Sequence, residues 1–73
     1  MEPTTLCKLM EASYHAARDL LMQAARDLDE AGRAAHQGER NQARGTAIGA
    51  ETDLQNALDL IKAVGALQLL DRG

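Results

Sequence analysis

The sequence predicts an all-α protein, an antiparallel two-helix hairpin with helices at about 4–37 and 41–70. Apolar residues recur at steps of three and four along both halves of the chain, which is the period of an amphipathic helix. A short polar segment around Gly38 separates the halves, and a short turn between long helices makes them antiparallel neighbours. The 73 residues leave room for one domain, 1–73, without an internal disulfide because Cys7 is the only cysteine.

The first predicted helix carries one continuous row of apolar residues. Pro3, with Thr4 or Thr5, marks its expected start, since these residue types favour the first turn of a helix. Charged residues such as Lys8 and Asp19 occupy the opposite side, which we expect to face water. The apolar row comprises Leu6, Met10, Tyr14, Ala17, Leu21, Ala24, Leu28, Ala31 and Ala35.

The break between the helices contains residues that suit a helix end and a helix start. Gly38 fits the left-handed position that ends a helix, and Asn41 is expected to cap the next one. After it, Gly45 and Gly49 lie four residues apart on one face of the second helix. We interpret this pair as a place where the two backbones approach closely; the alternative is a soft segment that becomes ordered on binding.

The last helix is apolar over an unusually broad arc. Six of its residues are expected to face the first helix, namely Leu54, Ala57, Leu58, Ile61, Val64 and Gly65. Leu60, Leu67 and Leu70 fall outside this group. A single partner helix covers one row, so the remaining apolar surface is expected to contact a second copy or another protein. The alternative interpretation is a loosely folded chain end.

The predicted partner-binding residues lie where the first part of the chain meets the last. In an antiparallel hairpin these two segments share the open end, defined here as the end opposite the turn. The predicted set is Leu6, Leu9, Met10, Tyr14, Leu58, Leu60, Ile61, Val64, Leu67 and Leu70.

Composition favours a weak core and a protein partner. The chain has no Trp or Phe, and its apolar content of 45% rests largely on Ala and Leu. Because alanine buries little area, we expect a weakly stable monomer that gains stability on association. The net charge of −3 comes from interspersed acids and bases, which argues against nucleic acid and membrane surfaces as partners. Neither a signal peptide nor a membrane span is visible, so we expect a cytoplasmic protein.

No residue pattern points to catalysis, a cofactor or a metal. His15 and His36 are 21 residues apart on one predicted helix, too far to share a metal ion. Cys7 has no histidine close in sequence to activate it as a nucleophile. Phosphate loops and zinc-ligand spacings are likewise missing, so a small enzyme is the least supported class.

The segment 53–65, DLQNALDLIKAVG, resembles the end of the small needle-subunit co-chaperones of type III secretion systems. The resemblance extends over about 20–67, through the amphipathic first helix and the turn at Gly38. It implies a cytoplasmic bacterial hairpin that docks on a tetratricopeptide-like chaperone. That pair would keep the needle subunit soluble and unpolymerised before export.

A self-assembling module is the competing hypothesis. The apolar row with steps of three and four in the first helix is also typical of a homodimeric four-helix bundle.

Overall fold

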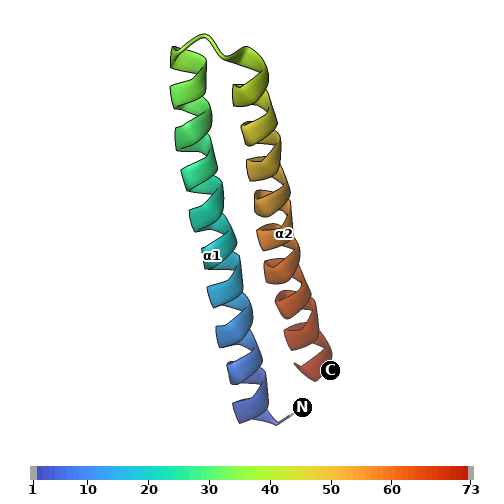
Figure 1. The fold of residues 1–73 in the computed structure, drawn as a ribbon. Coiled ribbons are helices and arrows are strands. Elements are labelled where there is room, and N and C mark those ends of the chain that lie inside the picture. Colours follow the sequence, from blue (N-terminus) through green and yellow to red (C-terminus); the bar gives the residue numbers. More distant parts are fainter. Residues whose placement is uncertain (1, 73) are drawn as a thin grey trace.

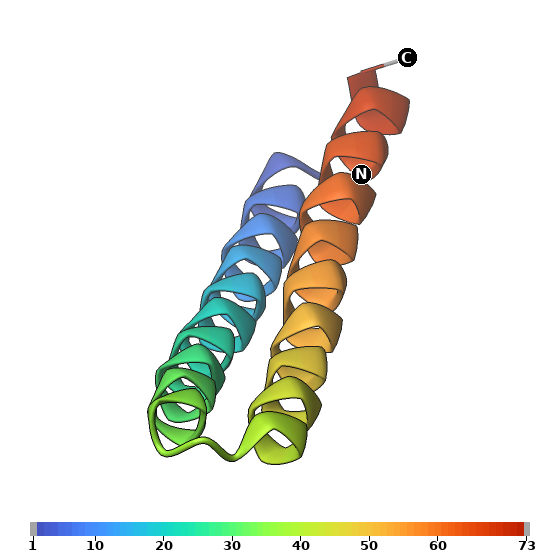
Figure 2. The same ribbon diagram turned by 90° about the horizontal axis from the view of Figure 1, so that it is seen from above.

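The predicted helical hairpin is confirmed by the computed structural model, which describes residues 2–72. Helix α1 (Pro3–His36) and helix α2 (Arg40–Arg72) contain 34 and 33 residues. They run antiparallel and side by side, with the two ends of the chain at the open end (Figure 1). The Cα atoms span 53 × 16 × 10 Å, so the molecule has two broad faces. Figure 2 shows that no third element of the described chain covers either helix.

Helix α1 begins at Pro3, as the sequence predicts. Proline is favoured at the first helical position because its fixed φ suits the helix and it has no N–H to leave unpaired. The preceding residue, Glu2, is extended, and its carbonyl accepts the N–H of Leu6 at 3.0 Å. The hydroxyl of Thr5 donates to the Glu2 carboxylate at 3.3 Å, which adds a side-chain link at the helix start.

The turn is closed by Gly38, which has a φ of +81°. The N–H of Glu39 donates to the carbonyl of Ala34 at 2.9 Å, and the N–H of Gly38 donates to Ala35 at 3.0 Å. This is the Schellman arrangement that ends a helix at a left-handed glycine. The expected cap at Asn41 is wrong, because α2 starts at Arg40 and Asn41 lies inside its first turn.

The two helices meet along small side chains that recur every seven residues. On α1 the row is formed by alanines, of which Ala24 is 1% exposed; on α2 Ala50 is 0% and Ala57 1% exposed. A seven-residue repeat keeps one side of each helix against its neighbour, as in a coiled coil. We call this contact the seam. Its buried members are Leu6, Ala17, Ala24, Ala31, Ala34, Ala50, Ala57 and Val64. Its half-buried members are Met10, Ser13, Leu20, Asp27, Ala43, Thr46, Asp53, Leu60 and Leu67.

The seam differs from the predicted contact. Tyr14, Leu21 and Leu28 of the expected α1 row are 42–50% exposed. On α2, Leu58 and Ile61 point outward, as does Leu54, whereas Leu60 and Leu67 are half-buried in the seam. The physical reason is that alanines let two backbones approach more closely than leucines do, so each helix turns its alanine row inward. The larger apolar side chains are then left on the outside.

The expected close approach at the two glycines of α2 is also wrong. A Cβ atom at Gly45 would meet nothing within 4 Å. At Gly49 it would meet one atom, Oδ2 of Asp27, at an ordinary contact distance of 3.8 Å. Neither glycine is therefore needed for the helices to pack, because the alanines of the seam already provide that fit.

Candidate protein-binding surface

Six large apolar side chains lie exposed along one side of the hairpin, and we call them the outer apolar face. Each of them is between 41% and 50% exposed. Three come from α1 and three from α2, so the surface spans both helices. Its members are Tyr14, Leu21, Leu28, Leu54, Leu58 and Ile61.

The helical period explains why these residues share one side. Leu21 follows the buried Ala17 by four residues, and Leu54 follows the buried Ala50 by four. Four residues is slightly more than one helical turn, so each leucine is rotated a little beyond its buried alanine and lies just beside the seam. Because the two helices are antiparallel, this rotation brings both leucines to the same broad face of the hairpin. Tyr14 and Leu28, seven residues either side of Leu21, extend the row.

The register across the seam can be read from Asp27, which lies beside Gly49. Since both helices rise by about 1.5 Å per residue, this contact brings Leu21 nearly level with Leu54. By the same argument Tyr14 is nearly level with Ile61. The outer apolar face is therefore a ladder of large side chains running from the open end towards the turn.

Charged side chains flank this face without interrupting it. Glu11 and Arg18 lie beside its α1 row, and Arg44 and Glu51 lie beside its α2 row. All four are exposed. Opposite signs alternate along each helix, so the margin of the face carries no net charge that would favour an acidic or a basic partner.

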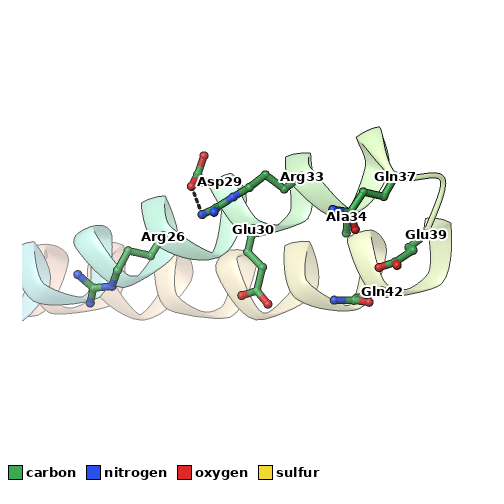
Figure 3. Close-up of a pocket in the computed structure, with 8 residues that line it drawn as sticks. All are labelled: Arg26, Asp29, Glu30, Arg33, Ala34, Gln37, Glu39 and Gln42. Carbon is green, nitrogen blue, oxygen red and sulfur yellow. Dashed lines mark hydrogen bonds and ion pairs between the residues drawn. The ribbon is translucent and has the colours of Figure 1, made fainter.

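The opposite broad face is polar near the turn. There Gln23 donates from Nε2 to Oδ1 of Asp27 at 3.0 Å, and Arg26 donates to the side-chain Oε1 of Gln23 at 3.0 Å. An open hollow at this end is lined by side chains from both helices, including Glu30 of α1 and Gln42 of α2 (Figure 3). Arg33 at its rim forms an ion pair with Asp29. This face offers hydrogen-bonding groups to water and lacks the apolar ladder of the other.

The ten predicted partner-binding residues divide into two sets in the structure. One set belongs to the seam and is covered by the other helix: Leu6, Met10, Leu60, Val64 and Leu67. The other set is exposed: Leu9, Tyr14, Leu58, Ile61 and Leu70. Of the exposed set, Tyr14, Leu58 and Ile61 belong to the outer apolar face.

Three members of the outer apolar face were missing from the predicted set, namely Leu21, Leu28 and Leu54. They were assigned to the contact between the helices because they continue the apolar rows. The signal that identifies them is the run of alanines at seven-residue spacing, Ala17, Ala24 and Ala31. Such a run marks a close helix contact and leaves the neighbouring leucines on the outside.

Other exposed apolar residues are scattered. Met22 and Ile48 lie on the backs of α1 and α2, away from the seam. Leu69 and Leu70 are the most exposed large apolar side chains, at 68% and 77%, in the last turns of α2. These positions do not form a row on both helices as the outer apolar face does.

Cys7 is exposed and its thiol is free. Within residues 2–72 no group of three or more His, Cys, Asp or Glu side chains is arranged to hold a metal ion. The same residues contain no helix apolar enough over a sufficient length to cross a membrane.

Comparison of the chain with models of known protein families, with curated proteins and with solved structures finds no match. The resemblance to secretion co-chaperones therefore stays a prediction from the residues quoted above.

Proposed function

We propose that this chain is a protein-binding co-chaperone of a bacterial type III secretion system. In this proposal it acts in the cytoplasm, docks on a tetratricopeptide-like chaperone and helps to keep the needle subunit soluble and unpolymerised. The observation that carries the protein-binding part is the outer apolar face, six large side chains that the hairpin itself does not cover. The secretion role rests on the resemblance of the segment 53–65 to those co-chaperones.

The physical mechanism is stoichiometric burial of apolar surface. Burying a large aliphatic side chain contributes about 1.5–3 kcal/mol when it passes from full exposure to full burial. The six side chains are at most half exposed, so each contributes a part of that amount. A helical surface of the partner, laid along the ladder from Tyr14 to Leu28, would cover them together.

Co-purification tests this proposal. The tagged chain would be co-expressed with a tetratricopeptide-like chaperone and a needle subunit from the same genome, and the complex isolated by size exclusion. Leu54→Asp is expected to abolish the complex, because it places a charge in the middle of the outer apolar face. Ile48→Asp is the matched control, since Ile48 is 50% exposed on the back of the same helix.

The proposal has two ways to fail. The three proteins would not co-purify, in which case the secretion role is wrong. Alternatively, Ile48→Asp and Leu54→Asp would weaken the complex equally, in which case the outer apolar face is not the docking surface.

A further inference from the structure

The hairpin buries mainly alanines and leaves six large apolar side chains exposed on its outer apolar face. Among residues 2–71, no large side chain is fully buried. A chain of this size usually needs a disulfide, a metal or association to be stable. Cys7 has no second cysteine in the sequence to pair with. Association is the source of stability that the outer apolar face can supply.

We propose that a second copy of this chain covers the outer apolar face, giving a twofold-symmetric four-helix bundle. This inference shares its surface with the proposed function but does not need the secretion role. A chaperone that docks on the same face would have to displace the second copy. The self-paired form is then the resting state of the protein.

The spacing of the exposed side chains favours helices as the covering structure. Tyr14, Leu21 and Leu28 recur every seven residues, as do Leu54 and Ile61. A seven-residue repeat stays on one side of a helix that supercoils slightly with a neighbouring helix, so this spacing suits a helical partner. The seam of the hairpin has the same repeat, so the outer apolar face is a second row of the same kind on each helix.

The dimensions also fit a second copy. The broad face of the hairpin extends over 53 × 16 Å between Cα atoms. A rectangle of these two dimensions has an area of the same order as the roughly 800 Å² of accessible surface that each partner buries in a stable protein interface. A second hairpin has the same length and width and would cover the whole face.

On α1, the charged residues beside the outer apolar face do not meet like charges when two copies pair. Consider a twofold axis that passes level with Leu21 and runs across the interface, perpendicular to the helices. This axis packs α1 antiparallel on α1 of the second copy. Glu11 then lies level with Ala31 of that copy, and Arg18 lies level with Ala24. Neither charged side chain is level with a charged residue of the second copy.

The same axis gives the same result on α2, since Leu54 is nearly level with Leu21. With the axis level with Leu54, Arg44 lies level with Val64 of the second copy, and Glu51 lies level with Ala57. Ile61 lies opposite Ala47, so a large side chain again faces a small one. Packing α1 on α2 of the second copy also pairs each of these charges with an uncharged residue, and either orientation covers the same face.

Sedimentation equilibrium of the unmodified chain at several concentrations tests the proposal directly. We expect the mass of two copies at high concentration, a reversible fall towards one copy on dilution, and a melting temperature that rises with concentration. Leu21→Asp is expected to shift the equilibrium to the monomer by more than tenfold. Met22→Asp is the matched control, because Met22 is the next residue, 51% exposed, on the back of α1.

A cross-linking measurement remains informative if Leu21→Asp fails to fold. In a Cys7→Ser background, an equal mixture of Leu21→Cys chains and Leu54→Cys chains should give disulfide-linked dimers on oxidation, like with like in one orientation and mixed in the other. Each chain carries one cysteine, so no disulfide can form within a hairpin. An equal mixture of Met22→Cys chains and Ile48→Cys chains should give much less. The proposal is overturned by a monomer at all concentrations, by a mass above two copies, or by equal effects of Leu21→Asp and Met22→Asp. A monomer that still co-purifies with the chaperone would overturn this inference and leave the proposed function standing.

Discussion

Asp27 of α1 lies beside Gly49 of α2, with its Oδ2 atom 3.8 Å from the place where a Cβ of Gly49 would stand. This distance is an ordinary van der Waals contact, so the packing of the helices does not require a glycine at position 49. The contact also shows which residues of the two helices are level with one another. Asp27 is half-buried in the seam and is held on its other side by the amide of Gln23.

Gly49→Ala is therefore expected to stabilise the hairpin. Alanine is favoured over glycine inside a helix by about 0.8–1 kcal/mol, and the new methyl group has room beside Asp27. Thermal or urea unfolding followed by circular dichroism would measure the gain. Gly45→Ala is the companion variant, and a comparable gain is expected because nothing lies within 4 Å of its Cβ position. A loss of stability at Gly45 would show that the helices approach there more closely than described.

The seam alanines are expected to resist enlargement. Ala24 is 1% exposed, so Ala24→Leu must push the two helices apart. Overpacking of this kind costs about 1–3 kcal/mol of the unfolding free energy. Ala12→Leu is the control, since Ala12 is exposed on the same helix, and a change within about 0.5 kcal/mol is expected. Equal destabilisation of the two variants in urea would contradict the alanine seam.

Leu60 and Ile61 are adjacent in sequence but have different roles in the fold. Leu60 is half-buried in the seam, and Ile61 is 44% exposed on the outer apolar face. Leu60→Asp should lower the melting temperature of the hairpin more than Ile61→Asp, because it places a carboxylate between the helices. Ile61→Asp should act mainly on association, measured by sedimentation. The opposite order would mean that α2 presents its other apolar row to α1.

The turn depends on the backbone conformation of Gly38. A residue with a side chain costs roughly 1–2 kcal/mol in the left-handed region, so Gly38→Ala should destabilise the hairpin by about that amount. Gly38→Asn should cost less, because asparagine tolerates this conformation. Chemical unfolding of the two variants side by side tests the order. Equal stability of the glycine, alanine and asparagine forms would show that the turn can close in another way.

The helices and the turn were predictable because they depend on local properties of the chain. The predicted bounds of about 4–37 and 41–70 lie within two residues of those observed. Gly38 was assigned correctly because few other residues adopt a positive φ. Asn41 was assigned wrongly as a cap, since the Schellman turn already positions Glu39 ahead of the first helical residue.

The outer apolar face was predicted only in part, because large apolar side chains were expected to fill the contact between the helices. Tyr14, Leu58 and Ile61 were expected at a partner surface and lie on the outer apolar face; whether they bind a partner stays a prediction. Leu21 and Leu54 were expected inside because large apolar side chains are usually buried. In this hairpin they are outside, since a two-helix contact is narrow and alanine fills it.

The sequence by itself determined that this chain forms two long helices joined at Gly38, because helical period and glycine conformation are local. It did not determine which apolar row of each helix turns inward. Both rows have helical spacing, so either is compatible with the pattern. Only the packed pair decides, because the energy of each choice depends on how closely the two backbones approach. The alanine row allows the closer approach, and the leucines beside it are left for another molecule.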